Sequence, residues 1–353
     1  MRKSNYQVLH FAILLFTLFI TGNNIVFAKT AKTTKQIPTN PWLDTSGRAI
    51  NAHGAGILFH KNKYYWYGEI KGDSTYRYDK VKTWECFRTE AGGVSCYSSR
   101  DLHNWKYEGV ALAPVINDST HAIHPSQVVE RPKVIYNAKT KQFVMWMHVD
   151  SPDYSKAACG VATSKTPTGP FTYMKTIRPL GNDSRDMTLF KDTDGRAYQI
   201  SSSENNATLH IYLLDDQYLN VTQTYTPVFK NKYREAPAVF KRKGKYYMIT
   251  SGCTGWVPNE AGYAVSDSML GGWQMKGNPC VGEGAKRTFE GQSTFVLPLN
   301  GTKDKYIALF DQWNKTDLDD SRYLWLPIEF KGEEMLINKG LGASCLIINT
   351  YKK

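Results

Sequence analysis

The chain has 353 residues, 13% of them aromatic, and 44 basic side chains against 32 acidic ones give a formal net charge of +12. This length suits one large all-β domain or two ordinary domains. The basic excess is spread along the chain and accompanies no nucleic-acid-binding motif, so we expect no nucleic-acid partner.

Residues 1–28 have the three parts of a secretory signal peptide. Arg2 and Lys3 give a basic start, an apolar stretch runs from about Val8 to Ile20, and a small residue at Ala28 suits cleavage. The apolar stretch is too short for a comfortable membrane span, and no cysteine follows for a lipid anchor. We therefore expect a secreted or periplasmic monomer without a membrane anchor.

After a polar leader at residues 29–41, which we expect to be flexible, one layout occurs five times. Each repeat has a short apolar run, a turn residue nine positions after its start, and a second run rich in aromatic residues. Two such runs around a turn predict a β-hairpin. The residues that open the five hairpins, called the strand-start residues below, are His53, Glu130, Asp186, Glu235 and Gln292.

Three hairpins are followed by a third predicted strand, which begins at Cys96, Gly160 or Gly262. A four-stranded sheet repeated around an axis is a propeller blade, and five repeats predict five blades. A two-sheet sandwich would not explain the constant nine-residue spacing. We therefore expect residues 42–353 to form a single all-β catalytic domain, a five-bladed β-propeller. Because an open ring leaves strand edges unpaired, we expect residues 42–50 to add a strand to the last blade.

The strand-start residues are polar, and in a propeller such positions meet at one mouth of the central channel. Glu130, Asp186 and Glu235 would then face one another, and like charges at short range raise the pKa of at least one carboxyl group. A protonated acid beside ionised neighbours is what acid–base catalysis requires. Hydrolysis of a glycosidic bond uses such a pair of carboxyl groups.

Seven segments resemble one known family: INAHGAGIL, YYWYGE, ERPKVIYN, SRDMTLF, REAPAVF, SGCTGW and FEGQST. Together they resemble glycoside hydrolase family 43, and within it the exo-β-1,3-galactanase (galactan 1,3-β-galactosidase) group, over essentially all of the chain after the signal peptide. The resemblance implies an inverting, exo-acting enzyme that releases galactose from β-1,3-galactan, the backbone of arabinogalactan. Its binding partner would be an oligosaccharide or polysaccharide.

The resemblance also implies roles for the strand-start residues. Glu235 matches the general acid, and Asp186 matches the carboxylate that raises the pKa of that acid and orients it. The usual base of the family, an aspartate in the first repeat, is replaced here by His53, as in the galactanase group. That group has a glutamine and a glutamate instead, matched by Gln292 and Glu130. We expect Gln292 to position the water, through an imidic tautomer, while Glu130 binds the sugar; alternatively Glu130 is the base.

Substrate-binding residues are sought among aromatic rings, because sugars present apolar C–H faces that stack on them. Trp146 and Trp256 are our candidates, since each lies beside a polar segment near the end of a predicted middle strand. The resemblance adds Glu69 and Thr254 as ligands of sugar hydroxyl groups. We place His53 beside the substrate or in a structural role.

Other interpretations stay open. Glu130 and Glu235 each neighbour an arginine, so either could belong to a structural ion pair, and Glu290 is a further candidate for the base. An α-L-arabinofuranosidase or β-xylosidase of the same family is a second enzyme candidate, although those enzymes use the missing aspartate. A carbohydrate-binding propeller without catalysis is the alternative from another class.

Six cysteines make a sparse set for a disulfide scaffold, although Cys86 with Cys96 and Cys253 with Cys280 are near enough in sequence to pair. No CxxC motif and no cluster of histidine and cysteine predicts a zinc site. We therefore expect no cofactor and no metal ligand among the site residues, while noting that some relatives carry calcium in the channel.

Overall fold

The computed structural model describes residues 41–341, so the predicted signal peptide and all but the last residue of the leader lie outside the described residues. Regular structure in this range is almost entirely β-strand, interrupted by short 3₁₀ segments such as η1 (Pro179–Gly181) and η2 (Ala285–Glu290). Between residues 41 and 341, no helix is long and apolar enough to cross a membrane.

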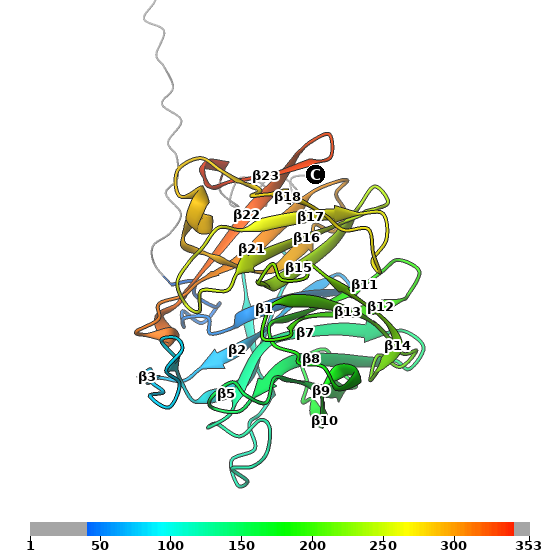
Figure 1. Ribbon diagram of the computed structural model, residues 1–353. Helices are drawn as coiled ribbons and strands as arrows, with labels where there is room; N and C mark the ends of the chain where they lie inside the picture. The colour runs from blue at the N-terminus through cyan, green and yellow to red at the C-terminus, as the bar shows by residue number, and fades with distance from the viewer. Residues whose placement is uncertain (1–40, 342–353) are drawn as a thin grey trace, which may run out of the picture. The chain divides into compact units, whose positions relative to one another are not determined.

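Five antiparallel sheets succeed one another along the chain and form a five-bladed β-propeller, which confirms the predicted fold (Figure 1). Blade 1 contains β1 (His53–His60), β2 (Lys63–Lys71), β5 (Ala91–Ser99) and β6 (Lys106–Leu112). Blade 2 contains β7 (Val128–Asn137), β8 (Gln142–Asp150), β9 (Ala158–Ser164) and β10 (Thr172–Ile177). Blade 3 contains β11 (Met187–Lys191), β12 (Ala197–Ser203), β13 (Thr208–Leu214) and β14 (Val221–Val228).

The last two blades differ in their strand number. Blade 4 contains β15 (Arg234–Arg242), β16 (Lys245–Gly252), β17 (Gly262–Ser266) and β18 (Gln274–Gly277). Blade 5 contains β20 (Gln292–Pro298), β21 (Tyr306–Gln312), β22 (Arg322–Lys331) and β23 (Glu334–Asn338). A short fifth strand, β19 (Cys280–Val281), pairs in parallel with β23 at the edge of blade 5.

Turn residues explain why the predicted hairpins recur at a fixed spacing. Asn62, Gly195, Gly244 and Gly301 all have a positive φ, of 60°, 88°, 84° and 74°. Glycine and asparagine adopt this left-handed conformation with the least strain. The nine-residue offset in the sequence therefore marks the tight turn between the two innermost strands of four blades.

A β-bulge follows the strand-start residue in three blades. The pairing register shifts after His53, Glu130 and Glu235, and the next residue in each case has a positive φ: 55° at Gly54, 52° at Arg131 and 53° at Ala236. Bulges bend a strand and redirect a side chain, and they are frequent beside active sites. The bulges therefore give consecutive residues at the channel mouth different directions.

Apolar clusters fill the spaces between neighbouring blades. The cluster between blades 5 and 1 contains Trp66, Trp105 and Trp325, all almost fully buried. The predicted closure by an added strand is wrong. Instead, Trp42 places its ring centroid 4.9 Å from that of Trp325, and Leu43 pairs only with Ala49. The hairpin of β22 and β23 already supplies the outer strands of blade 5, so side-chain packing closes the ring.

The suggested disulfides are absent from the described residues. Cys86, Cys96, Cys253 and Cys280 are all free thiols. Cys96 is buried within blade 1, whereas Cys280 lies in the edge strand of blade 5. The described residues hold together through their five apolar clusters.

Candidate active site

Four of the five strand-start residues line a single cavity with a volume of about 510 Å³. The starts of the inner strands meet there, at one mouth of the channel, as the repeat predicts. The fifth strand-start residue, His53, does not reach the cavity. The residues that line it include Glu69, Trp84, Glu130, Arg131, His148, Tyr154, Asp186, Asn206, Glu235, Cys253, Thr254, Trp256, Gln292 and Trp313.

Glu235, near the start of β15, has the carboxyl group best suited to carry a proton. Its Oε1 accepts a hydrogen bond from Nε2 of Gln292 at 3.0 Å, and its Oε2 a weaker one from Nδ2 of Asn206 at 3.3 Å. Burial, and then the nearby carboxylate of Asp186, raise the pKa of Glu235 to about 8, against a partial opposing effect of Arg131. Glu235 is therefore mostly protonated at neutral pH.

Asp186 immediately precedes β11 and is held by a buried arginine from blade 2. The Nε of Arg131 lies 2.9 Å from Oδ2 of Asp186. The backbone nitrogen of Arg131 also donates to Oε2 of Glu69 at 2.7 Å, and its Nη1 donates to the carbonyl oxygen of Ser293 at 3.0 Å. Arg131 thus joins groups from blades 1, 3 and 5, because the bulge after Glu130 turns it away from its sequence neighbour.

Gln292, the first residue of β20, has its amide fixed by four hydrogen bonds. Its Oε1 accepts from Nη2 of Arg131 at 2.6 Å and from Nε1 of Trp313 at 2.9 Å. Its Nε2 donates to Glu235 at 3.0 Å and to Oγ of Ser251 at 3.1 Å. Two donors on the oxygen favour the ordinary amide over the imidic tautomer and direct the nitrogen toward Glu235.

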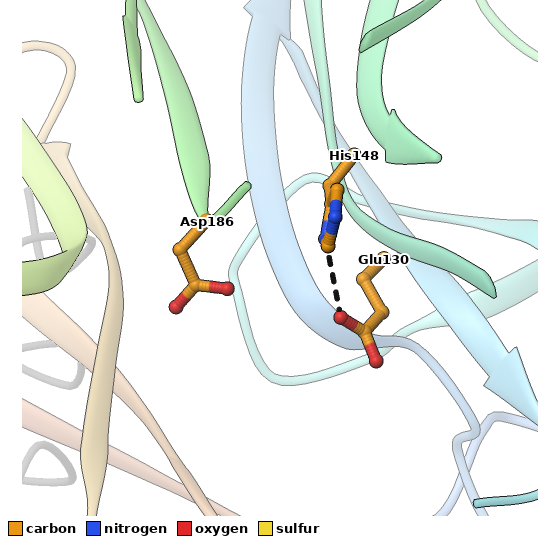
Figure 2. Close-up of side chains that lie close together, drawn as sticks. All are labelled: Glu130, His148 and Asp186. Carbon is orange, nitrogen blue, oxygen red and sulfur yellow. Dashed lines mark ion pairs between the residues drawn. The ribbon is translucent and has the colours of Figure 1, made fainter. Parts of the chain in front are cut away.

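Glu130 is an ionised carboxylate surrounded by donors. The hydroxyl of Tyr154 donates to its Oε1 at 2.8 Å, and Nζ of Lys71 lies 3.8 Å from the same oxygen. Figure 2 shows the ion pair of Glu130 with His148, whose Nδ1 lies 3.3 Å from Oε2. Burial alone would raise the pKa of Glu130, but the contact with His148 and the charge of Lys71 hold it well below its ordinary value. Glu130 is consequently a good ligand and a weak base.

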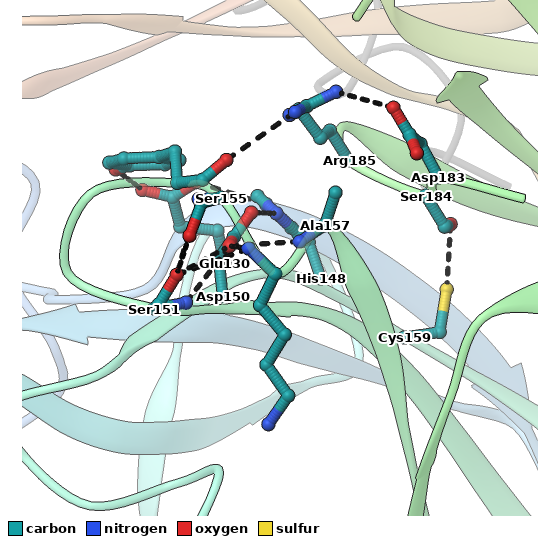
Figure 3. A network of polar contacts seen from close by, with 12 residues as sticks. Glu130, His148, Asp150, Ser151, Ser155, Ala157, Cys159, Asp183, Ser184 and Arg185 are labelled. Atoms are coloured by element: carbon teal, nitrogen blue, oxygen red, sulfur yellow. Dashed lines mark hydrogen bonds and ion pairs between the residues drawn. The ribbon is translucent and has the colours of Figure 1, made fainter. Parts of the chain in front are cut away.

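A polar network behind Glu130 fixes this arrangement (Figure 3). The Nε2 of His148 lies 2.9 Å from Oδ2 of Asp150, whose Oδ1 accepts backbone N–H groups of Ser151 and Ala157, both at 2.9 Å. Burial opposes the charged imidazole, but hydrogen bonds to Asp150 and then Glu130 raise the pKa of His148 to about 9. The network folds the loop between β8 and β9 so that Tyr154 reaches Glu130.

Glu130, His148 and Asp186 form a cluster in which one potential metal-ligand atom from each residue lies within 4.8 Å of the others. Metal ligation requires a neutral imidazole and free carboxylates. His148 is instead protonated at neutral pH by its raised pKa, and Asp186 already pairs with Arg131. In this arrangement all three groups are engaged by protein partners.

Three predicted substrate-binding residues lie in the cavity wall, namely Glu69, Thr254 and Trp256. Glu69 lies near the end of β2, and its Oε1 lies 2.7 Å from Nζ of Lys71. Trp256 donates from Nε1 to the carbonyl oxygen of Phe87 at 3.0 Å, which anchors the blade 4 loop that also carries Thr254. These three residues are placed where a sugar in the cavity would meet them.

Two other predicted substrate-binding residues do not reach the cavity. Trp146 is fully buried between blades 2 and 3, where its Nε1 donates to the carbonyl oxygen of Tyr218 at 2.8 Å. His53 is fully buried as well, with its Nδ1 3.5 Å from Asp311 and its ring stacked on Tyr323. Rings without exposed surface cannot stack on a sugar, so both assignments are corrected to structural roles.

The further base candidate, Glu290, is also misplaced for catalysis. Its carboxylate pairs with Arg287 at 2.6 Å on the surface, and its side chain is 53% exposed. It lines no part of the main cavity. Although it stands two residues before Gln292 in the sequence, it ends the 3₁₀ segment η2 and not a strand, so the alternation of a strand does not apply to it.

The open cavity at the mouth of the propeller contains a protonated carboxyl group beside an ionised carboxylate. Glycoside hydrolases use such a pair of groups to break a glycosidic bond. The family described as glycosyl hydrolases family 43 matches residues 57–310. The chain belongs to this family and is a glycoside hydrolase.

Three solved structures show which members it is similar to. A family 43 β-1,3-galactosidase solved with galactodeoxynojirimycin is 43% identical, with a TM-score of 0.77 over 85% of this chain and 97% of that one. An exo-β-1,3-galactanase from Phanerochaete chrysosporium, solved with galactose, is 38% identical, with a TM-score of 0.75 over 85% of this chain and 66% of that one. An exo-β-1,3-galactanase from Clostridium thermocellum is 39% identical, with a TM-score of 0.74 over 86% and 64%. A search of curated proteins found no match.

Proposed function

We propose that this protein is an inverting, exo-acting hydrolase that releases galactose from the non-reducing end of β-1,3-galactan, the backbone of arabinogalactan. The observation that carries this proposal is the hydrogen bond between Gln292 and the protonated Glu235. The first-blade position of the usual family base holds His53, which is buried outside the cavity. A glutamine at the cavity is the feature expected of the galactanase group. The three similar structures are of one β-1,3-galactosidase and two exo-β-1,3-galactanases.

Glu235 acts as the general acid in this proposal. Its Oε1 is engaged by the amide of Gln292, and the longer 3.3 Å contact from Asn206 leaves Oε2 as the oxygen that carries the proton. This proton passes to the glycosidic oxygen as the bond to the anomeric carbon breaks. Burial, together with the carboxylate of Asp186 that Arg131 holds in place, keeps the pKa of Glu235 high enough for the proton to be present at neutral pH.

Gln292 orients the attacking water, whose oxygen bonds to the anomeric carbon while the proton that it loses passes to solvent in the open cavity. Glu130 binds a sugar hydroxyl group. Glu130 is disfavoured as the base because Lys71, His148 and Tyr154 already stabilise its ionised form. A water at Gln292 would have to replace one of its present partners, and the contact to Ser251, at 3.1 Å, is the longest of the four. None of these roles calls for a metal ion.

The experiment that tests the proposal is product analysis. Purified protein is incubated with β-1,3-galactan, and the released sugars are separated by chromatography, with the slower variant E235Q as the control. Galactose as the first and only small product supports exo-cleavage. No described feature favours an α-L-arabinofuranosidase, a β-xylosidase or a non-catalytic carbohydrate-binding propeller over this activity.

We also propose that the protein is exported and acts as a monomer. Export is supported by the basic start and apolar stretch within residues 1–28. The proposal of a monomer rests on the closed ring, because all five blades of one chain contribute groups to the cavity. Size-exclusion chromatography and mass determination of the secreted protein test both statements.

A further inference from the structure

Blade 1 carries an insertion, residues 72–90, between its strands β2 and β5. It contains the two-residue strands β3 (Tyr76–Arg77) and β4 (Phe87–Arg88). Arg88 is 3% exposed and fastens the insertion to blade 2. Its guanidinium donates to the carbonyl oxygens of Pro152, Ser126 and Gln127 at 3.2, 3.0 and 3.0 Å.

Blades 4 and 5 hold the same insertion from the other side. The carbonyl oxygen of Phe87 accepts from Nε1 of Trp256 in the blade 4 loop at 3.0 Å. The hydroxyl of Thr75 accepts from the backbone nitrogen of Leu318, in the blade 5 loop, at 2.8 Å, and β3 lies beside that loop in Figure 1. The insertion is thus fastened to blades 2, 4 and 5, and it forms a fixed wall along part of the channel mouth.

The insertion presents one aromatic ring to the cavity, that of Trp84, which is half-buried. Its ring centroid lies 5.4 Å from that of Tyr154, with an edge-to-face geometry. On another side lies Gly255, where a Cβ atom would come within 3.1 Å of the indole and where φ is 58°. Glycine therefore leaves room for the ring, and Tyr154 and Gly255 fix where it stands.

We propose that Trp84 stacks on the apolar face of the terminal galactosyl residue and so determines specificity for a chain end. Tyr154, which touches the indole, donates to the sugar-binding candidate Glu130, so Trp84 lies on the side of the cavity assigned to the bound galactose. The axial hydroxyl group of galactose leaves its opposite face rich in C–H groups, which suits an indole. Because the insertion that carries Trp84 is fastened to blades 2, 4 and 5, we expect it to block sugars beyond the terminal galactosyl residue. This inference rests on the proposed function.

Galactose binding tests it without relying on turnover. Calorimetry gives the Kd of galactose for the wild type and for W84A, W84F and W84L, and KM and kcat are measured on β-1,3-galactobiose. We expect W84A and W84L to weaken galactose binding about tenfold or more, and to raise KM more than they lower kcat. W84F should retain most of the affinity. The control is Y76A, because Tyr76 lies in the same insertion, is 39% exposed and lines no part of the cavity.

Two results would overturn the inference. One is an unchanged galactose Kd in W84A, W84L and W84F alike. The other is a raised KM for the disaccharide with an unchanged galactose Kd, which would assign Trp84 to the leaving sugar. If W84A does not fold, the comparison of W84F with W84L decides the matter. A wild-type protein that neither binds galactose nor cleaves galactan refutes the proposed function itself, before any variant is made.

Discussion

The side-chain nitrogen of Gln292 lies 3.0 Å from Oε1 of Glu235 and donates a hydrogen bond to it. The oxygen of the same amide faces the opposite way, toward Arg131 and Trp313. One glutamine therefore links the proposed acid to the guanidinium that also holds Asp186. Substitution of Gln292 should affect both the orientation of the acid and the position of the water.

Replacement of Glu235 by glutamine removes the proton donor while nearly preserving its shape. We expect E235Q to lose roughly 10²–10⁴-fold in kcat on β-1,3-galactan, because general acid catalysis contributes about that much. Thermal unfolding should be little changed. The matched control is E290Q, which alters a surface carboxylate outside the cavity and should keep wild-type activity. Near-normal turnover by E235Q would remove Glu235 from the role.

The pH profile follows from the raised pKa of Glu235, about 8. The protonated form is the active one, so kcat/KM should be high below this pKa and should fall about tenfold per pH unit above it. Glu130 has a pKa well below its ordinary value and stays ionised, so it adds no loss of activity at mildly acidic pH. Initial rates across the pH range on β-1,3-galactobiose check this. An alkaline limb near pH 5 would show that Glu235 has an ordinary carboxyl pKa.

Variants of Gln292 and Glu130 show which of the two residues activates the attacking water. We expect Q292A to lose at least about 10²-fold in kcat, and Q292E to keep part of the activity because a carboxylate also orients and deprotonates water. E130A should bind substrate poorly and should not be rescued by azide. Near-normal turnover by Q292A, together with azide rescue of E130A to give an α-galactosyl azide, would instead make Glu130 the base.

Stereochemistry is predicted from the roles of the site residues. A retaining enzyme needs a second carboxylate as its nucleophile, whereas the carboxylates of Asp186 and Glu130 are paired with Arg131 and Lys71 here, and the proposed water activator is the amide of Gln292. Because an amide that orients water forms no covalent intermediate, we expect a single displacement by water, with inversion. Proton NMR of fresh digests of β-1,3-galactobiose should show α-galactose first. First formation of β-galactose would indicate a covalent intermediate.

The sequence predicts the propeller because its signal is periodic. Turn glycines such as Gly195 and Gly244 recur at the same offset, and four of the five strand-start residues do line one cavity. A repeated position has the same place in every blade, so its side chains converge. The prediction fails for the segment that belongs to no repeat. The closure by residues 42–50 depends on the packing of Trp42, which no spacing records.

The residues that hold the acid and the glutamine in place are equally hidden from the sequence. Arg131 follows Glu130 and looks like its ion-pair partner, but a bulge directs it to Asp186 and Gln292. Trp146 and Trp256 look alike as aromatic residues near strand ends, yet only Trp256 stands in a loop at the mouth. Sequence position gives the strand, whereas bulges and loop paths decide the direction of a side chain.

The most direct test of the central claim is the first product released from a defined panel: β-1,3-galactan, β-1,4-galactan, and aryl α-L-arabinofuranoside and β-xyloside. The account predicts galactose from β-1,3-galactan alone, with no larger oligosaccharide at early times, and release by E235Q that is roughly 10²–10⁴-fold slower. Release of arabinose or xylose from the aryl glycosides, with no galactose from β-1,3-galactan, would contradict it.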